Sequence, residues 1–252
     1  MNDVTFRMDL FPEIIKKELL ACTFYRPCTT DILIVVHNQL SYLKKCIQSI
    51  RSNTENYQIY IWNNNSDLET TEWIKSQKDI ICVHHQTNIG FIEPNNRLIE
   101  IGSGEFVILV NSDTEVLPNW QKAMISQIQM YGYAQVGYLG GNLNENGKGS
   151  IFKFGQDVDY ICGWCFCIPR FIFEKYGLFD EQNLKFAYCE DSDFSLRLTE
   201  NNEKIYALHL GLVIHHENKT IKAIMNEVDC KKSFVNNHEF IKKRWSHRFF
   251  RP

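Results

Sequence analysis

The sequence predicts an α/β fold built on a mainly parallel sheet. Short apolar segments alternate with segments of helical periodicity, and most of the apolar segments end in a polar turn. One segment, residues 106–110, is apolar at every position and follows a break at Gly102–Glu105. Such an uninterrupted run is typical of a central strand covered on both faces. The 252 residues, 44% of them hydrophobic, suffice for one large domain with a full core.

The first half of the chain supplies four strands and the helices between them. We expect strands at residues 31–37, 57–62, 80–84 and 106–110. We expect helices at residues 12–20, 42–52, 69–76, 94–101 and 119–131. Ser41 is the predicted cap of the second helix, because a serine hydroxyl accepts from the free N–H groups of a first turn. Strands and helices that alternate at this spacing indicate β-α-β units.

The pattern changes after residue 137, where glycine and asparagine become frequent. We expect a short polar stretch at 150–159, strands at 159–168, 204–208 and 211–215, and helices at 169–176, 192–201 and 230–245. The chain then divides into three predicted parts. They are an N-terminal extension with a short helix at 1–30, the main domain at 31–228, and a helical tail at 229–252 packed on that domain.

Charge and composition exclude several classes of protein. The net charge of −3 gives no basic surface for nucleic acid, and no 18-residue apolar run is present to span a membrane. The N-terminus lacks the apolar core of a secretion signal. The basic residues near the end of the tail leave open a peripheral contact with an anionic membrane.

The nine cysteines are an odd number without the spacing of a disulfide framework. We therefore expect reduced thiols in a cytoplasmic protein. Cys162, Cys165 and Cys167 form a cluster, but no second Cys or His pair at matching spacing accompanies them. They are predicted to be core thiols on a strand rather than zinc ligands.

Four polar loops are expected to converge at the carboxyl edge of the sheet, where open α/β sheets bind ligands. They are residues 37–39, 63–67, 111–115 and 190–193, and His215 with His216 closes the last strand. Each loop alone is more typical of turn chemistry than of a site. Together they offer groups suited to a ribose, a base edge, a metal ion and a proton.

These loops resemble the motifs of the family 2 glycosyltransferases of the GT-A fold. The matching segments, in order, are 36–38, 63–66, 88–91, 95–97, 111–116, 177–181, 190–194 with Arg197, and 214–216. The resemblance runs from about residue 31 to 217 and leaves a rhamnosyltransferase-like branch open. It implies a Rossmann-like, mainly parallel sheet flanked by helices, with a small antiparallel addition.

The resemblance also implies a reaction, which is sugar transfer from a nucleotide-diphosphate sugar to a hydroxyl of a glycan, lipid-linked or protein acceptor. Asp191 matches the general base of the family, which takes the proton from the attacking hydroxyl. The hydroxyl oxygen attacks the anomeric carbon in a single displacement, which inverts the anomeric centre. Asp113 and His215 match the ligands of a divalent cation, Mn or Mg. Trp164 and Glu190 are the expected contacts of the acceptor or transferred sugar.

A further set of residues is implied to bind the nucleotide-sugar. It consists of His37, Asn38, Asn63, Asn65, Asn88, Gly90, Asn96, Asn111, Ser112 and Asp113. Relatives often carry Asp at the position of Asn63, so this asparagine leaves the identity of the base open. Gly90 is expected to allow close backbone approach. Arg197 is expected either to reach the diphosphate or to pair with an acid.

Two alternatives remain. A nucleotidyltransferase shares a nucleotide-binding α/β half, but it would need basic residues after the first strand, where the sequence has His37-Asn38-Gln39. A non-catalytic module that binds a nucleotide-sugar or a glycan is the alternative from another class. The single acid in the Asn111-Ser112-Asp113 triplet and the asparagine at position 63 favour such a degraded site slightly, whereas the retention of Asp113, Asp191 and His215 together argues against it.

Overall fold

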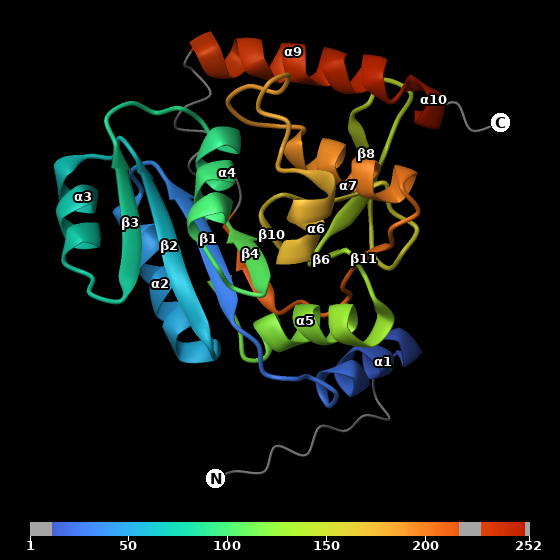
Figure 1. Cartoon of the computed structure of the whole chain (residues 1–252), viewed down its shortest axis with the longest axis horizontal. Helices are drawn as coiled ribbons and strands as arrows, with labels where there is room; N and C mark the ends of the chain where they lie inside the picture. The colour runs from blue at the N-terminus through green and yellow to red at the C-terminus, as the bar shows by residue number, and fades with distance from the viewer. Residues whose placement is uncertain (1–11, 217–227, 250–252) are drawn as a thin grey trace.

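The computed structural model describes residues 12–216 and 228–249 (Figure 1). A seven-stranded sheet with the order β11-β6-β10-β4-β1-β2-β3 forms its centre, and β10 is the strand that runs antiparallel to its neighbours. Its strands are β1 (Thr30–Val36), β2 (Tyr57–Asn64), β3 (Ile80–His85), β4 (Phe106–Val110), β6 (Gln135–Gly137), β10 (Cys165–Pro169) and β11 (Ile205–Ala207). The predicted mainly parallel α/β fold is confirmed.

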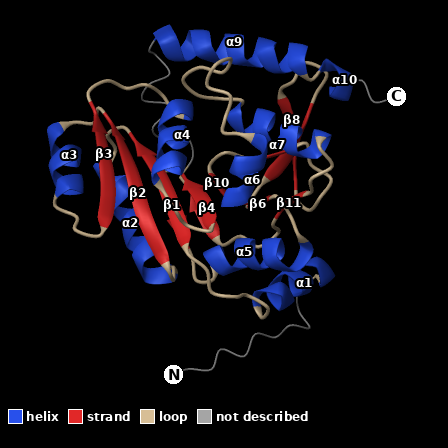
Figure 2. Ribbon diagram, viewed as in Figure 1, coloured by secondary structure: helices blue, strands red, loops and turns tan. Residues whose placement is uncertain are grey.

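Helices cover both faces of this sheet (Figure 2). They are α1 (Glu13–Cys22), α2 (Leu40–Asn53), α3 (Leu68–Lys75), α4 (Ile92–Ile101), α5 (Trp120–Tyr131), α6 (Arg170–Tyr176), α7 (Glu190–Glu200), α9 (Val228–Arg244) and α10 (Ser246–Phe249). Side chains alternate between the two faces along each strand. In β1, Ile32 and Ile34 pack in the core under α2, α3 and α5, whereas Leu33 packs in the core under α4, α6 and α7.

Two small antiparallel sheets stand beside the central one. One pairs β5 (Thr114–Val116) with β12 (Val213–His215). The other has the order β8-β7-β9 and consists of β7 (Gly140–Leu143), β8 (Gly149–Lys153) and β9 (Tyr160–Ile161). The predicted antiparallel addition is therefore present, although the β7–β8 hairpin lies where a glycine-rich and polar stretch was expected.

Two local predictions were wrong. The expected strand at 159–168 is split into β9 and β10, because residues 162–164 form a turn that leaves one sheet and enters the other. Ser41 does not cap α2, which already begins at Leu40 after Gln39 in a left-handed conformation.

The two terminal helices pack on the domain at its opposite ends (Figure 1). At one end, α1 lies against α5, and the buried carboxylate of Glu18 accepts from the Tyr206 hydroxyl and from the backbone N–H of His209 and Leu210. At the other end, α9 buries Ile241 in the core around α7. Within the described ranges, no helix combines the length and apolar character needed to cross a bilayer.

All nine cysteines lie within the described residues, and each is a free thiol. Cys165 and Cys167 are fully buried on β10, as expected for core thiols, and burial raises the pKa of both thiols. Among residues 12–216 and 228–249, no group of three or more His, Cys, Asp and Glu side chains is arranged to hold a metal ion.

Candidate active site

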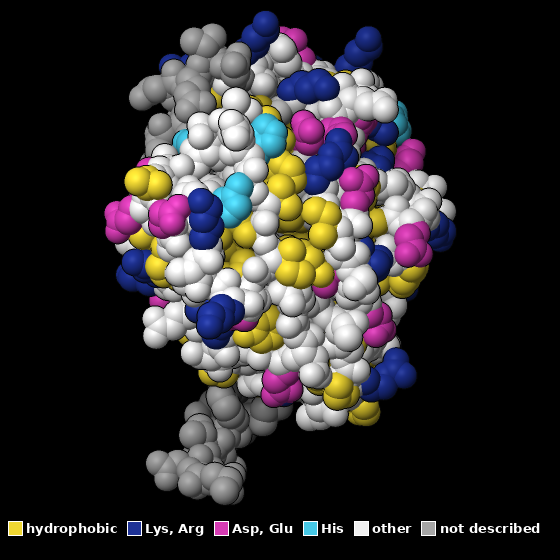
Figure 3. All heavy atoms as spheres, turned by 60° about the vertical axis from the view of Figure 1, so that its left-hand side comes forward, with side chains coloured by type: hydrophobic (Ala, Val, Ile, Leu, Met, Phe, Trp, Pro, Cys, Tyr) yellow, Lys and Arg dark blue, Asp and Glu magenta, His cyan; other side chains and the backbone are white. Residues whose placement is uncertain are grey.

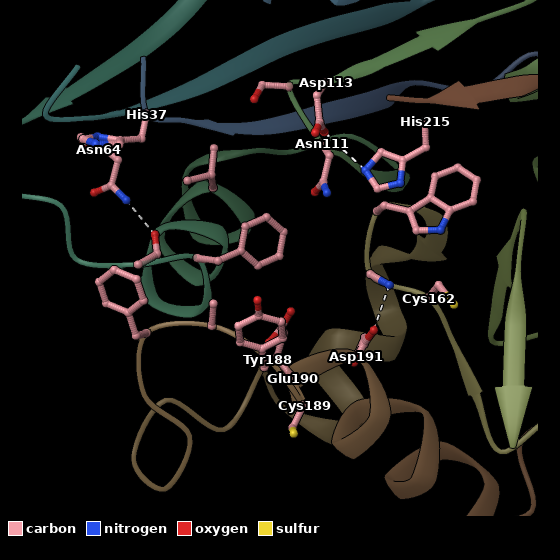
Figure 4. Close-up of a pocket in the computed structure, with 18 of the residues that line it drawn as sticks. His37, Asn64, Asn111, Asp113, Cys162, Tyr188, Cys189, Glu190, Asp191 and His215 are labelled. Carbon is pink, nitrogen blue, oxygen red and sulfur yellow. Dashed lines mark hydrogen bonds and ion pairs between the residues drawn. The ribbon is translucent and has the colours of Figure 1, made fainter. Parts of the chain in front are cut away.

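A cavity of about 740 Å³ opens at the carboxyl edge of the central sheet. Its walls come from the ends of β1, β2 and β4, from the small β8-β7-β9 sheet, and from the loop that enters α7. Hydrophobic side chains gather near the centre of one face of the molecule, with histidine side chains beside them (Figure 3). Asp113, Asp191 and His215, which are far apart in the sequence, all line this one cavity (Figure 4).

Asp113 and His215 form a pair on one wall. His215 Nε2 lies 3.3 Å from Asp113 Oδ1, yet this buried nitrogen has no partner within the described residues that meets hydrogen-bond geometry. Asp113 is 3% exposed. A buried imidazole nitrogen without a hydrogen bond, beside a carboxylate oxygen, is a donor set that suits a cation.

The β5–β12 sheet holds this pair together. His215 stands opposite Thr114 in the register, and the backbone N–H of His216 donates to the Asp113 carbonyl at 2.9 Å. His216 turns the other way and its Nε2 lies 2.7 Å from Glu115 Oε1. The Trp164 ring stacks on the His215 ring at 5.2 Å between centroids. His215 is thus fixed by its own strand on one side and by an indole on the other.

Asp191 lies in the first turn of α7, on the wall opposite this pair (Figure 4). The N–H of Gly163 donates to its Oδ2 at 2.8 Å, and the N–H of Ser192 donates to its Oδ1 at 2.6 Å. Burial raises the pKa of Asp191, although these hydrogen bonds act in the opposite direction. The carboxyl group is held in one orientation and its proton affinity is increased, as a general base requires.

Glu190, the residue before it, is a second carboxyl in the same wall. It is 7% exposed, and its Oε2 has no hydrogen-bond partner among the described residues. Burial, together with the charge of Asp191, raises the pKa of Glu190 to about 8. Burial and the repulsion between two neighbouring carboxyls both disfavour the state in which Glu190 and Asp191 are ionised together.

The loop before α7 is strained and tightly held. Phe186, Tyr188 and Cys189 all adopt positive φ angles, of 64°, 77° and 72°, a conformation that costs a residue with a side chain about 1–2 kcal/mol. The Phe186 carbonyl accepts from the N–H of Phe91 at 2.5 Å, and a Cβ atom on Gly90 would overlap it. The predicted close backbone approach at Gly90 is made by this loop.

The C-terminal helix α9 also fastens this loop. The side-chain amide of Asn237, which is 1% exposed, donates to the carbonyls of Lys185, Ala187 and Tyr188 at 2.8–3.0 Å. Its oxygen accepts from the Lys185 N–H at 3.0 Å. One buried side chain thus satisfies four backbone groups next to the two carboxyls.

The opposite end of the cavity is lined by polar groups of the first two strand ends. His37 Nδ1 lies 2.8 Å from the Asn64 carbonyl, and the Asn64 amide donates to Asn88 Oδ1 at 2.6 Å and to the Gly90 carbonyl at 2.7 Å. Asn111, Ser112 and Trp164 also line the cavity. The predictions omitted Asn64, although it lies between two asparagines that they include.

Four of the predicted nucleotide-sugar residues lie outside the cavity lining, and tertiary contacts explain three of them. Asn63 is 2% exposed; its amide donates to Thr71, and its oxygen accepts from Ser66. Asn96 is 1% exposed and bonds Phe179 and Glu181. Asn38 links the first two strand ends through the N–H of Asp67, and Asn65 lies exposed in the turn.

Arg197 was expected either to reach the diphosphate or to pair with an acid, and the structure shows the second. It pairs with Asp193 at 3.1 Å and donates to two backbone carbonyls, so it is structural. Among the described residues that line the cavity, none is Lys or Arg. Aromatic side chains supply much of the remaining wall. Phe91 belongs to the 88–91 motif, whereas the sequence carried no signal for Phe152, Tyr160, Phe186 and Tyr188.

Comparison with known proteins identifies the family. The profile of glycosyl transferase family 2 matches residues 31–177, more than half of the chain, and the chain belongs to this family. An uncharacterized protein of Sinorhizobium fredii is 24% identical over 88% of the chain, which spans 28% of that relative. An uncharacterized glycosyltransferase of Rickettsia typhi is 26% identical over 88% of the chain and 71% of its own length.

Solved structures show the same fold. GalNAc-T7 with UDP, GalNAc and Mn²⁺ has a TM-score of 0.62 at 16% identity, over 72% of this chain and 42% of its own. The mannosyltransferase PcManGT of Pyrobaculum calidifontis, in complex with GDP-Man and Mn²⁺, also has a TM-score of 0.62, at 10% identity over 93% of this chain and 79% of its own. The fold is GT-A, as the loop motifs predicted.

Proposed function

We propose that the chain transfers a sugar from a nucleotide-diphosphate donor to an acceptor hydroxyl, with inversion and with the assistance of a divalent cation. One observation carries the proposal, which is that Asp191 faces the Asp113–His215 pair across a single cavity (Figure 4). A base on one wall and a cation site on the other leave room between them for the reacting carbon. The neighbours that bind UDP or GDP-Man with Mn²⁺ support this class of donor.

The charge of the cavity supports a cation. A diphosphate would enter a site that already contains Asp113, Glu190 and Asp191 and that no described Lys or Arg lines. Two ligands on neighbouring corners of an octahedral cation lie about 3 Å apart, close to the 3.3 Å between Asp113 Oδ1 and His215 Nε2. When bound, the cation would neutralise the charge that collects on the leaving diphosphate.

Asp191 would act on the acceptor. Its Oδ1 accepts from both the N–H and the hydroxyl of Ser192, whereas its Oδ2 accepts from the N–H of Gly163 and keeps a lone pair for a hydroxyl in the cavity. The hydroxyl proton would pass to this carboxylate as the oxygen attacks the anomeric carbon. One displacement of this kind inverts the anomeric centre, which NMR of the product would show.

Asp191→Asn tests the assignment. A screen of UDP-, GDP-, CMP- and dTDP-sugars with Mn²⁺ first identifies the donor by the rise in melting temperature. We expect the variant to lose transfer by about 10²–10⁴-fold while it binds the donor as before. Asp157→Asn, in which the side chain is 82% exposed, is the matched control. Unchanged turnover in Asp191→Asn would refute the role of this base.

The non-catalytic binding module remains the second candidate. The Asn63 side chain bonds Thr71 and Ser66 within the protein, so it offers no free group to the nucleobase of a donor. Release of the nucleoside diphosphate from the identified donor separates the two functions. The enzyme hydrolyses the donor slowly even without acceptor, whereas a binding module releases none. Mn²⁺ titration of His215→Gln by calorimetry, with weaker binding expected than in the wild type, tests the cation site without any turnover.

A further inference from the structure

The face of the small β8-β7-β9 sheet that borders the cavity is aromatic. Gly141 stands opposite both Phe152 and Tyr160 in the register, so the three residues share one face. A Cβ atom at Gly141 would meet the hydroxyl and two ring carbons of Tyr160 at 2.8–3.0 Å, so the hydroxyl end of this ring packs against the glycine. Phe152 and Tyr160 both line the cavity, and together they form an aromatic face.

Phe152 is the exposed member of this aromatic face. It is 68% exposed, whereas Tyr160 is 7% exposed. Its neighbour on β8, Ile151, is 59% exposed and points to the other side of the sheet, because side chains alternate along a strand. A large apolar ring left open at the mouth of a cavity is typical of a surface that a ligand covers.

The carboxyl group of Glu190, next to Asp191, adds a polar group to the cavity beside the aromatic face. Glu190 lines the cavity, and its buried Oε2 has no hydrogen-bond partner among the described residues. A buried polar atom without a partner is unfavourable unless a ligand satisfies it. A neutral sugar ring satisfies both features, because its hydroxyls bond carboxyl oxygens and its C–H faces lie against aromatic rings.

The charges of the cavity discriminate between acceptor classes. Asp191 carries a negative charge beside Glu190, and the described lining contains no Lys or Arg to offset an anionic acceptor. A phosphate or carboxylate on the reacting part of the acceptor would be repelled. We propose that this half of the cavity is an acceptor subsite for the sugar ring of a neutral glycan, which stacks on Phe152 and Tyr160 and bonds Glu190.

This inference rests on the proposed transferase function and extends it to the acceptor. Binding is the direct test, with saturation-transfer NMR on a panel of probes in the presence of the nucleoside diphosphate and Mn²⁺. The panel holds neutral methyl pyranosides and disaccharides, sugar 6-phosphates and glucuronides as anionic counterparts, and octanol as an apolar alcohol. We expect saturation of the ring C–H protons of neutral glycosides and little or none for the other probes.

Two variants on the same strand localise the binding. Phe152→Ala is expected to raise the dissociation constant for the best neutral glycoside about tenfold. Phe152→Tyr keeps an aromatic ring and is expected to bind this glycoside as the wild type does. Ile151→Ala removes a similarly exposed side chain from the opposite face and is expected to change it less than twofold. Melting temperatures of all variants show that they fold, which the exposure of both positions favours.

Three results would overturn the proposed subsite: preference for the anionic probes, preference for octanol, or equal binding of glycosides by Phe152→Ala and the wild type. Absence of saturation for every neutral glycoside would do the same. Release of the nucleoside diphosphate by the wild type, measured in parallel, reports on the donor half alone. Failure of the transferase function is thereby distinguished from failure of the acceptor assignment.

Discussion

The buried carboxylate of Glu18 makes a sharp test of how α1 is fastened to the domain. Glu18 is 1% exposed and accepts from the Tyr206 hydroxyl at 2.9 Å, from the His209 N–H at 2.9 Å and from the Leu210 N–H at 3.1 Å. The ring Nδ1 of His209 also lies 2.9 Å from it. Glu18→Gln keeps the shape, but it removes the charge and turns an NH₂ group toward these donors.

The expected loss follows from the number of donors. Hydrogen bonds to a charged group contribute about 1.5–3 kcal/mol each, and the glutamine oxygen keeps some of them. We therefore expect a decrease of about 3 kcal/mol in the free energy of unfolding. For a chain of this size that corresponds to a fall of about 6–12 °C in melting temperature.

Urea unfolding followed by circular dichroism measures the effect. Glu13→Gln is the matched control, because it makes the same change on the same helix at a side chain that is 73% exposed. The control is expected to change stability by less than about 0.5 kcal/mol. If Glu18→Gln and Glu13→Gln lose the same stability, the buried network around Glu18 does not hold α1 in place.

Three further predictions concern the cavity and the core. Because burial raises the pKa of Asp191 and the base must be ionised, kcat/KM should fall as pH drops through a value above the usual carboxyl range near 4, as a pH–rate profile would show. Gly90→Ala should cost at least about 2 kcal/mol in urea unfolding, through its φ of 92° and its overlap with Phe186, whereas Gly211→Ala, with no neighbour within 4 Å, should cost far less. Fully buried Cys46 should resist a thiol reagent until the protein unfolds, because burial raises its pKa to about 12; rapid labelling of the native protein would contradict its burial.

The central strands could be predicted because their signal is local. Residues 106–110 are apolar at every position and glycines precede them, so one window of sequence identifies β4. The β7–β8 hairpin gives no such signal, since its glycines Gly141 and Gly149 are required by the Tyr160 ring that lies across them. A contact between distant residues, rather than strand propensity, decides the sequence there.

The residues of the candidate site also fall into those that the sequence predicted correctly and those that it did not. Asp113, Asp191 and His215 were found through motifs that end strands or begin a helix, and they do meet in one cavity. Asn63 and Asn96 were expected beside them, but an amide bonds whichever partners the fold brings close, and both amides serve neighbouring backbone and side chains. Polar residue types indicate where a site lies, whereas tertiary contacts decide which of them remain available to a ligand.

The contact of Asn237 with the loop before α7 bears on how this domain can be engineered. A family profile ends at residue 177, and the last strand of the small β5–β12 sheet ends at His215. A chimera that borrowed only residues 31–216 would appear complete by either criterion. It would nevertheless lack the side-chain amide of Asn237, which bonds Lys185, Ala187 and Tyr188. The loop that positions the carboxyls of residues 190 and 191 would then lose these hydrogen bonds. Domain swaps among relatives should therefore carry α9 along with the loop that Asn237 holds.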